Sequence, residues 1–252
     1  MAALKLSVRA EAEAPLAEGR VVLMLDGQPV AIDLAVPPGP ATAQEVLPIL
    51  QGLASFLADR AAGKVEGQGR AISCRAGCGS CCRQLVPVAP SEARALAQLV
   101  EAMPEPRRAR VRRKFADALD ALEAAGLLEQ LNGSLAAPDR LALAMDYFRL
   151  GIACPFLEEE ACSVHPDRPL ICREYLVTSP AANCATPTPE TIVRVPFDAV
   201  PSKALSHVDG GWTPLVLALR FNETAPPAPA TDGPALIGAL FHRLSIGDAK
   251  EI

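Results

Sequence analysis

Eight cysteines are the residues of this chain whose type and spacing can carry chemistry. They are Cys74, Cys78, Cys81, Cys82, Cys154, Cys162, Cys172 and Cys184. The first four fall within nine residues, and the next three fall within nineteen. Thiolates gathered in this way repel one another, so the pattern predicts a metal ion or cluster that absorbs their charge.

Disulfide bonds and buried single thiols are the two alternative interpretations of these cysteines. Disulfide frameworks belong to small exported domains, whereas this chain has 252 residues and a poor secretory signal, with charges at Lys5 and Arg9. Cys81 and Cys82 are adjacent, and a bridge between neighbours is strained. Buried thiols that serve only as apolar residues need no clustering. The sequence therefore favours metal binding in a reducing compartment, and we expect a cytoplasmic protein.

The metal itself is open between zinc and an iron–sulfur cluster. Four thiolates suit either a tetrahedral zinc ion or a [4Fe–4S] cluster, so eight can form two sites or one site with spare thiols. Short gaps combined with distant partners favour the larger cage of the cluster. The spacing Cys74-x3-Cys78-x2-Cys81 also occurs in radical-SAM enzymes. Those enzymes need strand–helix units after the motif, and the residues after Cys82 instead resemble helices.

Charged residues around the second group of cysteines are predicted to surround the metal. Arg168 and Arg173 can donate hydrogen bonds to sulfur or balance thiolate charge, with ordinary surface ion pairs as the alternative. His165 can be a ligand, although the cysteines already suffice and a turn position is favoured. The basic run 107–114 is interpreted as a solvated helix face, with a docking surface for an acidic partner or nucleic acid as the alternative. The net charge of −5 argues against nucleic-acid binding.

The two cysteine groups together resemble those of the bacterial cysteine-cluster family named after YkgJ. The matching segments are Cys74-x3-Cys78-x2-Cys81-Cys82, Cys154-Pro-Phe-Leu, Cys162-Ser-Val-His, Arg168-Pro169 and Cys172-Arg173-Glu174. The family writes its first motif as Cys-x2-Cys-x2-Cys-Cys, so this chain carries one extra residue after Cys74. The resemblance covers residues 74–184 and implies a zinc- or iron-chelating domain or an Fe–S-cluster protein. The signature is also similar to that of flagellin lysine methylases, which implies an enzyme as a further alternative.

The elements that must position these cysteines are predicted to be strands first and helices afterwards. Alternating apolar residues predict strands within residues 4–36, with a hairpin turn at Asp26-Gly27. Thr42 and Glu45 form a capping-box pattern for a helix that ends near Gly63. Further helices are expected from an N-cap at Ser91, up to residue 125, over 139–150, after residue 214 and over 236–244. We expect a hairpin around residues 158–160, a short helix at Cys172, a strand over 192–195 and a linker over 225–234.

These elements predict an α+β protein: a mainly α-helical cysteine-cluster domain with a β-rich N-terminal portion. We expect a strand portion with its helix over residues 1–66, the metal-binding domain over 67–190 and a strand-and-helix extension over 191–252 packed on it. No run approaches the ~18 apolar residues of a membrane span, so no membrane partner is expected. The predicted function is metal binding with a redox or accessory role. An enzyme and a purely structural zinc protein are the alternatives; no catalytic residue is identified, and a protein partner stays open.

Overall fold

The computed structural model describes residues 3–8, 15–132, 137–188 and 190–246. Its N-terminal part is a three-stranded sheet of β1 (Leu4–Ser7), β2 (Ala17–Leu25) and β3 (Gln28–Val36) in the order β1-β3-β2. β1 runs parallel to β3, and β2 runs antiparallel to it. Asp26 and Gly27 join β2 to β3 with φ values of 51° and 71°, which is the backbone of a two-residue hairpin turn. The predicted strands and turn are confirmed.

The long helix α1 (Ala43–Gly67) begins at the predicted capping box. The Thr42 side chain accepts a hydrogen bond from the Glu45 backbone N–H, and the Glu45 carboxylate accepts one from the Thr42 backbone N–H at 2.7 Å. The helix continues four residues beyond Gly63 because its buried face recurs at helical spacing as far as Val65. α1 therefore reaches from the sheet to the segment that leads into the first cysteines.

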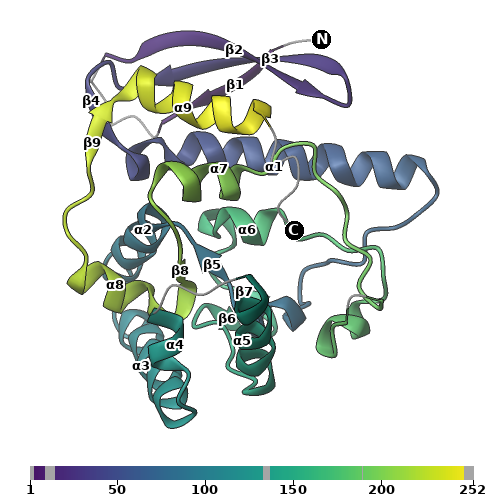
Figure 1. The fold of residues 1–252 in the computed structure, drawn as a ribbon, viewed down its shortest axis with the longest axis vertical. Coiled ribbons are helices and arrows are strands. Elements are labelled where there is room, and N and C mark those ends of the chain that lie inside the picture. Colours follow the sequence, from purple (N-terminus) through teal and green to yellow (C-terminus); the bar gives the residue numbers. More distant parts are fainter. Residues whose placement is uncertain (1–2, 9–14, 133–136, 189, 247–252) are drawn as a thin grey trace.

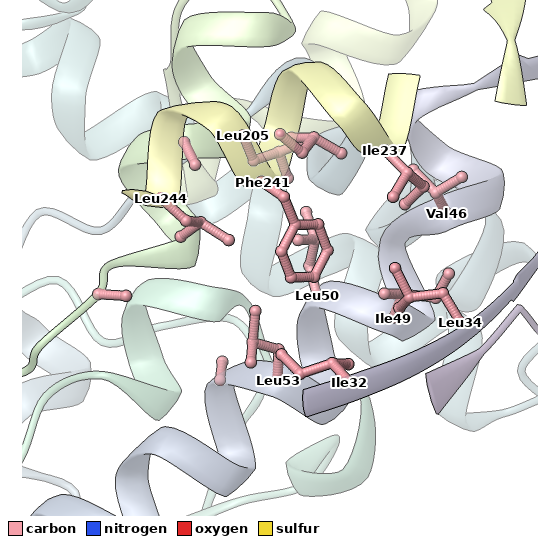
Figure 2. Packing of buried hydrophobic residues seen from close by; sticks show 14 of the residues in the cluster. Ile32, Leu34, Val46, Ile49, Leu50, Leu53, Leu205, Ile237, Phe241 and Leu244 are labelled. Atoms are coloured by element: carbon pink, nitrogen blue, oxygen red, sulfur yellow. The ribbon is translucent and has the colours of Figure 1, made fainter. Parts of the chain in front are cut away.

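Two C-terminal helices, α7 (Pro201–Val208) and α9 (Gly233–Ile246), complete the N-terminal sheet. Figure 1 shows α9 and α1 beneath the sheet and α7 below α9. In Figure 2, side chains of β3, α1, α7 and α9 point toward one another around Phe241. We call β1 to β3 with α1, α7 and α9 the sheet layer. The core of this layer contains residues from both the N-terminal and the C-terminal part of the chain. Each part therefore buries its apolar side chains against the other.

A second group of helices lies below α1, on the side opposite the three-stranded sheet (Figure 1). Its elements are α2 (Pro90–Glu101), α3 (Arg107–Ala124), α4 (Leu128–Asn132), α5 (Ala137–Arg149), the 3-10 turn η4 (Leu215–Leu217) and α8 (Ala218–Thr224). A two-stranded pairing of β5 (Pro87–Val88) with β8 (Thr213–Pro214) ties α2 to η4. These helices surround two further apolar clusters, one of which includes Phe115 and Phe156.

Short elements carry the cysteines. They are η1 (Ser80–Arg83), β6 (Leu157–Glu158), β7 (Ala161–Cys162), η2 (His165–Asp167), α6 (Leu170–Arg173) and η3 (Ala181–Ala185). The hairpin of β6 and β7 and the short helix at Cys172 occur where the sequence predicts them. The remaining backbone around the thiols is loop.

Several expected elements differ from the structure. Ser91 is not an N-cap: the cap is Ala89, because Pro90 occupies the first helical position and the Glu92 carboxylate accepts the Ala89 N–H at 2.9 Å. Residues 192–195 form an isolated bridge, between Arg194 and Val177, in place of the expected strand. The expected linker 225–234 contains β9 (Ala230–Asp232), which pairs with β4 (Pro40–Thr42).

The helix α7 has no counterpart among the predictions, although Pro201 at its first turn and its buried Ala204 and Leu205 are typical of a short amphipathic helix. The α+β class is confirmed by the helices and several small sheets. In the part of the chain that is described, no helix combines the length and apolar character needed to cross a membrane.

Candidate metal centre

The first motif, Cys74 to Cys82, is a loop that ends in η1. Gly77 has a φ of 79°, a left-handed backbone that suits glycine, and this explains why the segment is not a continuous helix. Gly79 lies against the second motif so closely that a Cβ would stand 3.2 Å from the Glu160 Cα and 2.9 Å from Leu157 Cδ1. The glycines that separate the cysteines therefore allow the two motifs to approach.

The second motif, Cys154 to Cys172, is joined to the first by a backbone hydrogen bond and by an ion pair. The Cys154 backbone N–H donates to the Cys82 carbonyl at 2.7 Å. Arg83 forms a bidentate pair with Glu160, at 2.9 and 2.7 Å, and also donates to the Gly79 carbonyl at 3.0 Å. Because charged hydrogen bonds with two-point geometry fix orientation, these contacts set how the two motifs face each other.

The hairpin of the second motif is held by α3. Phe156 packs edge-on against Phe115, with ring centroids 5.5 Å apart. Lys114 donates to the Leu157 carbonyl at 2.7 Å, and Arg107 donates to the Ser163 carbonyl at 2.8 Å. Lys114 and Arg107 of the basic run therefore position the second motif. The sequence analysis had interpreted this whole run as a solvated helix face. Nothing in the sequence indicates that these two side chains donate hydrogen bonds to backbone carbonyls of the second motif.

Cys172 is placed by α6, a helix of four residues. Its first backbone N–H, at Leu170, donates to the buried Glu92 carboxylate of α2 at 2.7 Å. Burial raises the pKa of Glu92 to about 7, against the lowering effect of its two backbone donors. At the other end of α6, the Glu174 carboxylate accepts hydrogen bonds from the Ser202 N–H and hydroxyl. α6 is thus fixed to both α2 and α7.

The two remaining thiols lie beside the chain that follows α6. Cys74 donates from Sγ to the Tyr175 carbonyl at 3.9 Å, and the neighbouring Ser73 N–H donates to Val177 at 2.9 Å. Cys184 is buried in η3, which packs against η1. The structure thus brings both motifs and Cys184 to one region around η1.

Burial and the neighbouring thiols together raise the pKa of several cysteines in this region. Burial raises the pKa of Cys154 to about 12, and the charges of Cys162 and Cys81 add to that rise. Burial and then the charge of Cys154 raise the pKa of Cys172 well above its ordinary range. The hydrogen bond with Cys82, followed by burial, does the same for Cys81. These thiols are therefore protonated at neutral pH, and each must release its proton when it binds a metal.

The donor set suits the predicted metals by chemistry, because all eight cysteines are free and thiolate is the ligand of structural zinc and of iron–sulfur clusters. Within the described residues, no group of three or more His, Cys, Asp or Glu side chains is arranged so that it could hold a metal ion as it stands. The thiols are gathered but not closed into a ligand cage. That these eight cysteines supply the metal ligands therefore stays a prediction.

Arg168 and Arg173 occupy different positions. The Arg173 guanidinium is buried and consumed by structural contacts, with Nε on the Arg168 carbonyl and one amino group on Ser55 Oγ, both at 3.0 Å. Arg168 instead has a buried Nε without a hydrogen-bond partner. Its charge counteracts the rise that burial causes in the pKa of Cys74 and Cys162. The charge of Arg168 thus acts on both thiols, whereas Arg173 joins α6 to α1 through Ser55 and also lowers the pKa of Cys162.

His165 is exposed at the start of η2. The charge of Arg168, followed by burial, lowers the pKa of this imidazole. Residues that sequence reasoning missed are Gly79, Arg83, Glu160 and Glu92. Their only sequence signal is a position beside a cysteine motif or a helix start, and their pairing is a long-range event.

Comparison with known families identifies one match. Residues 73–190 match the family model described as "CxxCxxCC: Putative zinc- or iron-chelating domain". No curated protein and no solved structure matches the chain. The match agrees with the expected cofactor, an iron–sulfur cluster or zinc.

Proposed function

We propose, starting from the CxxCxxCC zinc- or iron-chelating domain that residues 73–190 match, that this protein holds an iron–sulfur cluster of the [4Fe–4S] type through cysteines of both motifs. The observation that carries the proposal is the docking of the two motifs. Gly79, Arg83 and the Cys82 carbonyl bring the second motif onto the first, so that thiols far apart in sequence surround η1. A single local motif would supply no such enclosure.

The electrostatics of the region support a cationic or cluster partner. Several half-buried thiols lie close enough to raise one another's pKa, an arrangement that a metal converts from unfavourable to favourable. Arg168 offers an unused Nε–H beside Cys74 and Cys162. N–H donors to ligand sulfur stabilise such a centre and adjust its potential. A bound cluster supplies one-electron chemistry or a rigid cross-link, and Arg168 balances its charge.

Zinc is the second candidate, and one observation favours it. Residues 73–83 contain one fully buried residue, Gly79, so this loop has almost no apolar core of its own. A zinc ion that replaces missing core packing is the usual basis of structural zinc domains. The redox or accessory role, a protein partner and an enzyme of the flagellin lysine methylase type stay predictions. The eight free thiols suit the cytoplasmic location that we expect.

Anaerobic purification of the full chain tests the proposal. We expect a brown protein whose iron and acid-labile sulfide are equal in amount and whose visible absorption bleaches on reduction. Colourless protein with stoichiometric zinc would overturn the iron–sulfur assignment and support the structural alternative. Protein without either metal, whose thiols all react freely, would overturn both.

An arginine pair sharpens this test. We expect Arg168→Ala to lower the reduction potential of the cluster, because a positive charge near the cluster favours the reduced state. Arg75→Ala is the matched control, since Arg75 is an exposed arginine inside the first motif. Equal potentials in both variants would show that Arg168 does not act on the metal.

A further inference from the structure

The strand β2 is an edge of the three-stranded sheet, because β3 lies between it and β1. Figure 1 shows this sheet at the top of the molecule, with the helices beneath it. β2 has nine residues and pairs with β3 over its whole length without a bulge or a proline. Natural proteins usually protect such an edge by shortening, twisting or covering it. β2 therefore presents a long, regular edge that is available to a further strand.

The register of β2 shows which of its backbone groups point away from β3. Leu25 and Gln28 flank the two-residue turn, so they form a hydrogen-bonded pair. Hydrogen-bonded and non-hydrogen-bonded pairs alternate along an antiparallel ladder. The N–H and C=O groups that point to the free edge are therefore those of Glu18, Arg20, Val22 and Met24. These four residues are exposed, and within the described part of the chain their outward backbone groups form no hydrogen bond.

The segment from Ala17 to Val21 is complementary to itself when two copies run antiparallel. It has Gly19 in the middle, Glu18 and Arg20 on either side of it, and an apolar residue at each end. With a two-fold axis at Gly19, Glu18 lies opposite Arg20 of the second copy, and Ala17 lies opposite Val21 of the second copy. Opposite charges and apolar residues directly across two strands are stabilising pairs. The same segment therefore supplies both partners of every pair.

Glu18 and Arg20 have unused capacity for such a contact. Among the described residues, Glu18 takes part in no ion pair. Arg20 donates from Nε and Nη2 to Asp33 at 2.6 and 3.1 Å, which leaves its Nη1 without a partner in the described chain. No neighbour within one copy requires Gly19 either, since a Cβ there would meet nothing within 4 Å among the described residues. A glycine inside a strand weakens it and often marks the close approach of another backbone.

We propose that this protein forms a two-fold dimer in which β2 pairs antiparallel with β2 of a second copy, centred on Gly19. Glu18 and Arg20 then exchange both backbone hydrogen bonds with Arg20 and Glu18 of the second copy. The half-buried Ala17 and Val21 pack against each other across the axis and extend the core of the sheet layer. The two three-stranded sheets join into one, and this contact is independent of the metal-binding function. Because the paired segment is short, we expect the dimer to dissociate on dilution.

Sedimentation velocity of the full chain over a range of concentrations tests the dimer, in reducing buffer so that disulfide-linked dimers are absent. We expect the mass of the wild-type protein to rise from one chain toward two as the concentration increases. Glu18→Arg should stay a monomer, because it places two cations opposite each other. Arg20→Glu should stay a monomer because it places two anions opposite each other. A mixture of these two variants should recover the dimer, since both cross-strand pairs are again of opposite charge.

Glu66→Arg is the matched control, because it makes the same change of charge at an exposed residue of α1 and should dimerise like the wild-type protein. A wild-type chain that is monomeric at every concentration, or a dimer that survives in Glu18→Arg, would overturn the proposal. Folded single variants that do not associate when mixed would overturn it as well. Far-ultraviolet circular dichroism checks that each variant is folded. If Arg20→Glu unfolds through loss of its pair with Asp33, Glu18→Arg still decides, since Glu18 has no such pair among the described residues.

Discussion

The sheet layer and the cysteine motifs are stabilised in different ways. The sheet layer buries a continuous apolar core in which Ile32, Leu50 and Leu240 are fully inaccessible, with strands and helices long enough to be regular. The motifs consist of turns and helices of a few residues, and between Ser73 and Arg83 only Gly79 is buried. Hydrophobic burial scales with apolar area, so the motifs gain little from it. From this difference we expect the cysteine region to depend on bound metal for its stability more than the sheet layer does.

Contacts at α6 join the two regions. Arg173 reaches Ser55 of α1, Glu92 holds the first turn of α6, and Glu174 holds Ser202 of α7. These buried polar groups are satisfied by backbone and hydroxyl partners rather than by packing. The sheet layer therefore acts as a scaffold on which Cys172 has a fixed position.

Removal of metal is expected to have the largest effect and to be confined to the motifs. Metal binding to thiolate sites contributes on the order of 10 kcal/mol to folding of the segment that binds it. Chelation under anaerobic conditions should abolish amide-exchange protection in residues 73–83 and 154–186 and leave α1 protected. Hydrogen exchange with mass spectrometry measures both regions in one experiment. Equal loss of protection in α1 would show that the two regions are a single cooperative unit.

Truncation of the sheet-layer core is expected to destabilise the fold without changing metal binding. Leu50→Ala removes a fully buried side chain and should lower the free energy of unfolding by about 2–5 kcal/mol, because it leaves a cavity. Metal content per folded chain should not change. Urea denaturation followed by circular dichroism measures the loss. Val22→Ala is the control, since Val22 is 55% exposed and its truncation should be close to neutral. Loss of metal from folded Leu50→Ala protein would contradict the separation of the regions.

The buried Glu92, which joins α2 to α6, predicts that the free energy of unfolding depends on pH. Its pKa of about 7 in the folded protein lies above the ordinary 4.5, so the folded state binds the proton more tightly. The contribution of Glu92 protonation to the free energy of unfolding is full below pH 4.5 and is lost as pH rises through 7. Its total is on the order of 3 kcal/mol. Glu92→Gln should remove this part of the pH dependence. Unfolding curves of both proteins between pH 4.5 and 8 measure it, and parallel dependences would contradict the assignment.

A pair of glycine variants gives the smallest expected effects, with opposite signs. Gly79→Ala should destabilise the docked motifs by about 1–3 kcal/mol, because its Cβ would meet the Glu160 backbone at 3.2 Å. Gly63→Ala is the matched control in α1, where a Cβ meets nothing within 4 Å. It should stabilise the helix by about 0.5–1 kcal/mol. Thermal unfolding of both variants with bound metal measures the difference, and a stabilised Gly79→Ala would show that the motifs do not dock at this glycine.

Local rules predict much of the sheet layer. The hairpin at Asp26-Gly27 and the Thr42 capping box depend on residues within four positions of each other, and both are confirmed. Ser91 was a wrong cap because Pro90 occupies the first helical position, and the Glu92 carboxylate accepts the Ala89 N–H. The strand β9 has no apolar alternation, so its pairing with β4 could not be predicted from its own residues.

The cysteine types and spacing by themselves determined the class of chemistry, because thiolate is a metal ligand wherever it is placed. Turn and proline residues beside the cysteines also determined the hairpin at Glu158 and the short helix at Cys172, since such signals act over a few residues. Only the tertiary structure decided that Arg83 pairs with Glu160, that Arg173 reaches Ser55 of α1, and that η1 packs against η3. Those contacts join residues far apart in the chain. Their free energy depends on packing and burial in the finished fold, which no local pattern encodes.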